Sequence, residues 1–128
     1  MFGHGGTSAN LWSVSTGTNS IIANNGTGNL ASGSYSFVVG RTNNNLYGDN
    51  SSILGGFFNF TNGSPSIVVG GRANSAMTSY TFVGGGFSNR ASGISSTIVG
   101  GRGNLASGNY STIGGGRENT TSALNSGI

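Results

Sequence analysis

The chain has 128 residues with 26 Gly, one Pro and no Cys, and its five basic and two acidic side chains give a formal net charge of +3. The absence of Cys excludes a disulfide framework and thiolate metal sites, and so few basic residues do not make the basic stripe of a nucleic-acid-binding protein. An apolar fraction of 34% that includes seven Phe and four Tyr favours a folded chain with a small core over a disordered linker.

Residues 1–19 form an irregular segment, rich in Gly, Ser and Thr, whose large apolar side chains include Phe2, Leu11 and Trp12. Large apolar side chains in such a segment are typical of an anchoring contact with another protein, so we interpret it as a docking arm. A frayed terminus is the alternative. The segment lacks the basic region and apolar stretch of a secretory signal, and no apolar run in the chain is long enough to cross a membrane.

From residue 35 to residue 124 the chain repeats a 15-residue unit six times without an insertion. The sixth position of the unit is always Gly, and the tenth is always Asn. The Gly column consists of Gly40, Gly55, Gly70, Gly85, Gly100 and Gly115. The Asn column consists of Asn44, Asn59, Asn74, Asn89, Asn104 and Asn119. A degenerate unit at residues 20–34 keeps Asn29 in register but has Asn25 at the Gly position, which is typical of a cap.

A short period without insertions, rich in Gly and β-branched residues, predicts an all-β fold, a parallel β-solenoid of about six to seven coils. Equal positions of successive coils would then stack ~4.8 Å apart. We expect the Asn column to form a ladder whose side-chain amides hydrogen-bond from coil to coil. The Gly column marks a corner, where the chain turns with positive φ or brings two backbones close. The solenoid domain is expected over residues 20–124, followed by a C-terminal tail at 125–128.

Positions two to five of each unit predict a short strand, and we place its Ser/Thr and Val/Ile positions, the second and fourth, inside. The third and fifth positions share the outer face, where the large apolar residues are Phe37, Val39, Leu54, Ile67, Val69, Phe82 and Val99. One β-branched residue per coil is a thin core, because ~25 cal/mol per Å² of buried apolar area barely offsets an ordering cost of ~1–2 kcal/mol per residue. Burying the outer face between three copies would supply the missing area, so we predict a homotrimer with these seven residues in its interface.

The eighth position forms a stripe of aromatic and cationic side chains beside the Gly corner. Its members are Phe57, Arg72, Phe87, Arg102 and Arg117. Guanidinium groups stacked on neighbouring rings would make cation–π contacts of ~0.5–2 kcal/mol each. The stripe is interpreted as a stabilising feature, with a ligand stripe for a sulfated or sialylated glycan as the alternative.

No catalytic, metal or cofactor-binding constellation stands out in the sequence. The segment GRGNLA at residues 101–106 matches part of a dinucleotide fingerprint, but it recurs as a corner followed by Asn and no helix follows it. His4 lacks the Cys or acidic neighbours of a metal site, and there is no second His to activate a Ser. We therefore expect neither an enzyme nor a nucleic-acid-binding protein, and no cofactor.

The columns resemble a known family. The pattern A-S-G-x-Y-S-x-I-x-G-G-R-x-N, complete from Ala106 to Asn119, is similar to the head repeats of YadA-like trimeric autotransporter adhesins, and related Gly-rich coils occur in phage fibres. The resemblance covers about residues 20–124 and implies a left-handed, trimeric β-roll. Two features depart from it: the period is one residue longer than in the family, and the chain shows no coiled-coil stalk or membrane anchor.

Two functions follow as expectations. In the first, the protein is a structural component of a virion surface, a capsid decoration or cement protein or a fibre module of a phage-like particle, attached to a capsid or other virion protein through the arm at residues 1–19. In the second, it is an extracellular or cell-surface adhesin head that binds a receptor or a host glycan through its stripe. An ice-binding solenoid is a weaker option, because Phe37, Ile67 and Phe82 interrupt the hydroxyl column that it would need.

Overall fold

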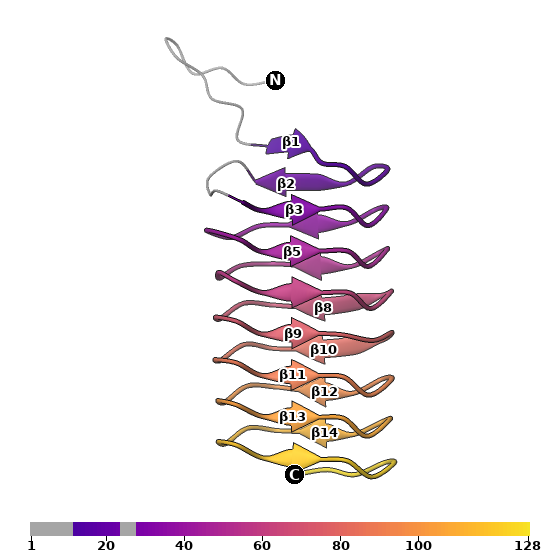
Figure 1. Cartoon of the computed structure of the whole chain (residues 1–128), viewed down its shortest axis with the longest axis vertical. Helices are drawn as coiled ribbons and strands as arrows, with labels where there is room; N and C mark the ends of the chain where they lie inside the picture. Colours follow the sequence, from indigo (N-terminus) through magenta and orange to yellow (C-terminus); the bar gives the residue numbers. More distant parts are fainter. Residues whose placement is uncertain (1–11, 24–27) are drawn as a thin grey trace.

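The computed structural model describes residues 12–23 and 28–128, which form fifteen β-strands and no helix (Figure 1). The strands of the first sheet, sheet A, are β1 (Trp12–Val14), β2 (Ile21–Ala23), β4 (Phe37–Val38), β6 (Ser52–Ile53), β8 (Ser66–Val68), β10 (Thr81–Val83), β12 (Thr97–Ile98) and β14 (Thr112–Ile113). The strands of the second sheet, sheet B, are β3 (Leu30–Ala31), β5 (Asn45–Leu46), β7 (Phe60–Thr61), β9 (Ser75–Ala76), β11 (Arg90–Ala91), β13 (Leu105–Ala106) and β15 (Thr120–Thr121). Among these elements there is no helical segment that could cross a membrane.

The chain alternates between the two sheets, so that each coil gives one short strand to each (Figure 1). From β2 onward, neighbouring strands within a sheet are parallel. Equivalent positions of the six regular units pair directly, as Phe82 pairs with Thr97 in sheet A and Arg90 with Leu105 in sheet B. In the degenerate unit the sheet A strand is shifted by one position, because Ile21 pairs with Phe37. The prediction of an all-β parallel solenoid of stacked coils is confirmed.

The N-terminal boundary expected at residue 20 needs a correction. β1 runs antiparallel to β2 and pairs Trp12 with Ala23, and the Trp12 ring stacks on the Phe37 ring with 5.5 Å between centroids. Gly17 accepts a hydrogen bond from the buried Ser20 hydroxyl at 2.7 Å, which joins this segment to the first coil. Residues 12–19 are therefore part of the solenoid and cover its first parallel strand.

The C-terminal residues 125–128 continue the coil instead of leaving it as a tail. Gly127 forms a parallel bridge with Thr112, and the Ile128 carbonyl accepts a hydrogen bond from the Gly114 N–H at 2.8 Å. The register of the repeat thus extends beyond the expected boundary at residue 124.

The core lies between the two sheets and is only one side chain deep on each side. The fourth-position residues of sheet A face the twelfth-position residues of sheet B, and all of them are 0–3% exposed. The fourth-position residues are Val38, Ile53, Val68, Val83, Ile98 and Ile113, and those of the twelfth position are Leu46, Thr61, Ala76, Ala91, Ala106 and Thr121. A β-branched residue opposite a small residue fills this narrow space, which explains the composition of both columns.

Thr61 introduces a polar atom into this core, since its Oγ1 is buried and has no hydrogen-bond partner. Val has nearly the same shape and replaces the hydroxyl by a methyl group. We expect Thr61→Val to raise the free energy of unfolding by about 1 kcal/mol, because an unpaired buried hydroxyl is costly. Thermal unfolding followed by circular dichroism at one protein concentration measures the change. A lower melting temperature for the variant would contradict it.

The tenth-position Asn side chains form a column inside the corner that leads from sheet A to sheet B. Asn89 shows the pattern: its Nδ2 donates to the carbonyls of Gly85 and Gly101, both at 2.8 Å, and its Oδ1 accepts from the Asn104 backbone N–H at 3.0 Å. The ladder therefore runs mainly through backbone groups, whereas we predicted amide-to-amide bonds. The fully buried members are Asn44, Asn59, Asn74, Asn89 and Asn104, and Asn119 is half-buried.

The sixth-position glycines lie at the bend between the sheets, but most of them do not have the expected conformation. Gly40 has a φ of 133°, whereas in later coils the left-handed residue is the seventh, as at Gly86 with a φ of 88°. A Cβ on Gly86 would overlap the carbonyl oxygen of Gly101, while a Cβ on Gly85 would have nothing within 4 Å. In the first unit Arg41 occupies the seventh position, so Gly40 takes the turn. The corner role expected for the sixth column is corrected for Gly55, Gly70, Gly85, Gly100 and Gly115.

Candidate functional site

The outer face of sheet A carries the apolar side chains that we expected to need cover. Leu54, Ile67, Val69 and Val99 are exposed, and the exposed fraction of Val99 is 55%. Three more, Phe37, Val39 and Phe82, are half-buried. We call this set the sheet A face: Phe37, Val39, Leu54, Ile67, Val69, Phe82 and Val99. The first-position tyrosines Tyr35, Tyr80 and Tyr110 are exposed as well.

The outer face of sheet B is different in character. Its eleventh and thirteenth positions in the six units are Asn45, Tyr47, Phe60, Asn62, Ser75, Met77, Arg90, Ser92, Leu105, Ser107, Thr120 and Ser122. Only four of these twelve are large and apolar, against seven of the twelve third- and fifth-position residues on sheet A. The two sides of the solenoid therefore offer different surfaces, and the apolar one is on sheet A.

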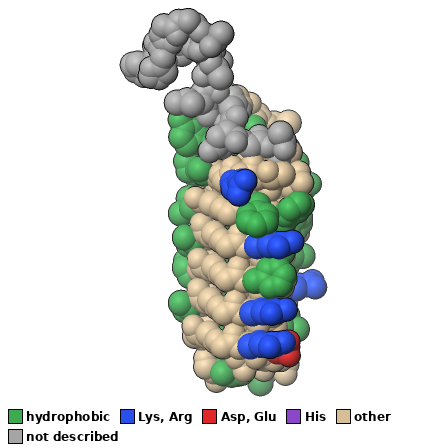
Figure 2. Space-filling model, turned by 90° about the vertical axis from the view of Figure 1, so that its left-hand side faces the viewer, with side chains coloured by type: hydrophobic (Ala, Val, Ile, Leu, Met, Phe, Trp, Pro, Cys, Tyr) green, Lys and Arg blue, Asp and Glu red, His purple; other side chains and the backbone are tan. Residues whose placement is uncertain are grey.

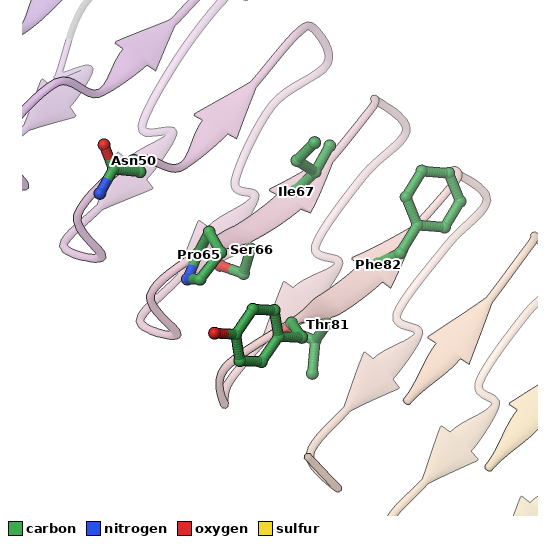
Figure 3. Close-up of a pocket in the computed structure, with 7 residues that line it drawn as sticks. Asn50, Pro65, Ser66, Ile67, Thr81 and Phe82 are labelled. Atoms are coloured by element: carbon green, nitrogen blue, oxygen red, sulfur yellow. The ribbon is translucent and has the colours of Figure 1, made fainter. Parts of the chain in front are cut away.

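A shallow hollow of about 250 Å³ lies within the sheet A face (Figure 3). Its walls come from β8 and β10 and from the turns before them, with Pro65 and Ile67 on one coil and Phe82 on the next. Its lining residues are Asn50, Pro65, Ser66, Ile67, Tyr80, Thr81 and Phe82. This hollow was not predicted from the sequence. The available signal was Pro65, which stands at the first position, where the five other units have Tyr, Asn or Ser.

The five eighth-position residues, which we call the Arg–Phe stripe, stack in single file along one corner of the solenoid (Figure 2). Parallel bridges join Phe57, Arg72, Phe87, Arg102 and Arg117 in that order. The Arg72 guanidinium carbon lies 5.4 Å from the ring centroids of both Phe57 and Phe87, and that of Arg102 lies 5.5 Å from the Phe87 centroid. The expected cation–π contacts are present, and the Arg72 guanidinium and the Phe87 ring each have a stacked neighbour on both flat sides.

The charges of the stripe are poorly balanced. Arg117 pairs with Glu118 at 3.1 Å between Nε and Oε1, which is the one ion pair in the part of the chain that the structure describes. Both side chains of the pair are 67% exposed, so it contributes little to stability. Arg72 and Arg102 have no acidic partner among the described residues, and both residues are exposed.

The docking arm can be placed only in part. Trp12 stacks on Phe37 and remains 49% exposed, next to the sheet A face. Phe2 and Leu11 lie outside the described residues, as does His4. Within residues 12–23 and 28–128, no group of three or more His, Cys, Asp or Glu side chains comes together.

The chain matches no protein-family model and no curated protein.

Proposed function

We propose that this protein is a non-catalytic structural component of a virion surface, a decoration or cement protein or a fibre module of a phage-like particle, that assembles as a homotrimer through the sheet A face. The observation that carries the proposal is the contrast between the two outer faces of a rod that is otherwise uniform. Sheet B exposes mostly polar residues, while sheet A exposes apolar residues on nearly every coil, Val99 and Leu54 among them.

The sixth-position glycines support this assembly. They follow the fifth position at the edge of the sheet A face, and a Cβ at Gly70, Gly85 or Gly100 would meet nothing within 4 Å in the single chain. None of the three has left-handed backbone, so the fold of one chain does not require Gly there. A neighbouring copy whose backbone approaches this edge closely would account for a column that is Gly in all six units.

The stability of the rod also favours assembly. Each coil buries one Val or Ile against one Ala, Thr or Leu, while the sheet A face stays in contact with solvent. Covering it adds apolar burial of ~25 cal/mol per Å² without ordering any further backbone. Three copies around an axis close such an interface, whereas an open arrangement would leave one sheet A face uncovered.

The placement on a virion is supported by the character of the molecule and by the resemblance of its columns to adhesin heads and phage fibres. A stiff rod that presents columns of small polar residues acts by shape and contact. Antibody labelling of purified particles and of whole cells tests this placement. Label on capsids, tails or fibres is expected, and label on the cell surface alone would favour the adhesin head.

Sedimentation of the purified protein tests the assembly, and a trimer is expected in place of the 12.7 kDa monomer. Val99→Asp places a charge in the proposed interface and should shift the protein to monomers, because a buried unpaired carboxylate costs several kcal/mol. Ser92→Asp makes a similar change on the outer face of sheet B and should leave the trimer intact. A stable monomer for the unchanged protein, or equal dissociation by both variants, would contradict the proposed interface.

A further inference from the structure

We propose that the Arg–Phe stripe is a binding site for an acidic glycan, whose sulfate or carboxylate groups are held by the guanidinium edges of Arg72, Arg102 and Arg117. The site is present in each single chain, so this proposal is independent of the trimer. The stripe holds three of the five basic residues of the whole chain, all on one corner of the rod.

The guanidinium groups of the stripe are free to bind a ligand. Arg72 and Arg102 are exposed, and their side chains make no ion pair or hydrogen bond within the described part of the chain. Each guanidinium has five N–H donors in a planar fork, and this fork fits the paired oxygens of a carboxylate or sulfate group. Since their contacts to the chain are to rings, these donors are available to a ligand.

The guanidinium groups are also held in place before a ligand arrives. Arg72 is stacked between the rings of Phe57 and Phe87 at 5.4 Å from each centroid, and Arg102 lies against the other side of Phe87 at 5.5 Å. Ordinary surface Arg side chains lose rotamer freedom when they bind an anion. Here the stack has already removed part of that freedom, so less is lost on binding.

Two like charges lie close together at the C-terminal end of the stripe. Arg102 and Arg117 occupy directly bridged positions on neighbouring coils, ~4.8 Å apart along the axis. Like charges in direct register destabilise a sheet, and Glu118 pairs with Arg117 only through an exposed contact. An oxyanion bound between the two guanidinium groups would relieve this repulsion, which makes this pair the strongest part of the site.

The same stack distinguishes between classes of anionic polymer. Proteins that bind single-stranded nucleic acid without sequence preference stack bases on open aromatic faces. Both faces of Phe87 are covered by guanidinium groups, so it offers no platform for a base. What remains outward is a row of N–H edges spaced by one or two coils, ~5 and ~10 Å, along a straight edge. An extended polysaccharide with repeated oxyanions fits this row better than a nucleic acid does.

The test compares binding of immobilised probes by the full chain and by two double variants of equal net charge. Arg72→Gln/Arg102→Gln removes two guanidinium groups of the stripe, and Arg41→Gln/Arg90→Gln removes two from outside it. Heparin is the sulfated probe, hyaluronan the probe with carboxylates alone, dextran the neutral one, and a single-stranded oligodeoxynucleotide the nucleic acid. All four side chains are exposed, so every variant should fold, which circular dichroism checks.

We expect the stripe variant to bind heparin about tenfold more weakly and the outside variant to change by less than about twofold, because hydrogen bonds to charged groups account for most of the affinity. Retention on hyaluronan as well would identify carboxylate as sufficient, and retention on heparin alone would identify sulfate. Equal losses for the two variants would show a net-charge effect and overturn the site. Absence of heparin and hyaluronan binding, or stronger binding of the oligodeoxynucleotide, would overturn it too.

Discussion

Replacing Asn89 by Leu is expected to lower the free energy of unfolding by about 3–5 kcal/mol, since several buried polar groups lose their partners at ~1–3 kcal/mol each. The carbonyls of Gly85 and Gly101 lose the Nδ2 donor that lies 2.8 Å from each. The next Asn of the ladder, Asn104, loses the Oδ1 acceptor for both its backbone N–H at 3.0 Å and its side-chain amide at 3.1 Å. Urea unfolding at a fixed protein concentration measures this loss.

Asn62→Leu is the matched control for that variant. Asn62 lies at the thirteenth position on the outer face of sheet B, is exposed and makes no side-chain hydrogen bond among the described residues. The same chemical change there should alter the free energy of unfolding by less than about 0.5 kcal/mol. If the two variants unfolded at the same urea concentration, the buried Asn column would not be what holds successive coils together.

Gly86→Ala is expected to destabilise the protein by more than about 3 kcal/mol, while Gly85→Ala changes the unfolding of a single chain by less than about 0.5 kcal/mol. Gly86 has a φ of 88°, and a Cβ there would overlap the carbonyl oxygen of Gly101 in the next coil and approach Asn89 Nδ2 to 2.7 Å. Gly85 has neither constraint. The pair is a strict comparison, because two adjacent glycines undergo the same substitution.

Thermal unfolding and sedimentation together separate the two effects. Gly86→Ala should lower the melting temperature or prevent folding. Gly85→Ala should keep the fold, and any effect is expected on assembly, because Gly85 borders the sheet A face. A Gly85→Ala protein that unfolds as easily as Gly86→Ala would contradict the assignment of the turn to the seventh position.

Much of the fold could be predicted because a repeat without insertions brings equal positions to the same place in every coil. The alternation of Ser, Ile and their neighbours around Ile98 was enough to place the fourth column inside, where it is fully buried. The spacing of Arg72, Phe87 and Arg102 was enough to predict stacked cation–π contacts, because residues at equal positions of neighbouring coils lie ~4.8 Å apart, close enough for a guanidinium group to stack on a ring.

Other features could not be predicted from the columns. Two consecutive glycines, such as Gly85 and Gly86, look equivalent in a repeat, although only one has left-handed backbone. Arg41 at the seventh position of the first unit is an exception that the structure explains, because there the turn moves to Gly40. The antiparallel pairing of Trp12 with Ala23 lies outside the repeat, so no repeated position of the sequence predicts it.

The sequence by itself determined the period of the coil, the stacking of equal residues and the identity of the inward-facing columns. These properties depend only on the order of residue types and on the two-residue alternation of a strand. The tertiary structure decided which glycine turns the chain, that the Asn side chains bind backbone carbonyls of two coils, and that Pro65, Ile67 and Phe82 enclose a hollow. Each of these depends on the direction of a side chain or a carbonyl, which is set by contact between neighbouring coils and not by the order of residues within one of them.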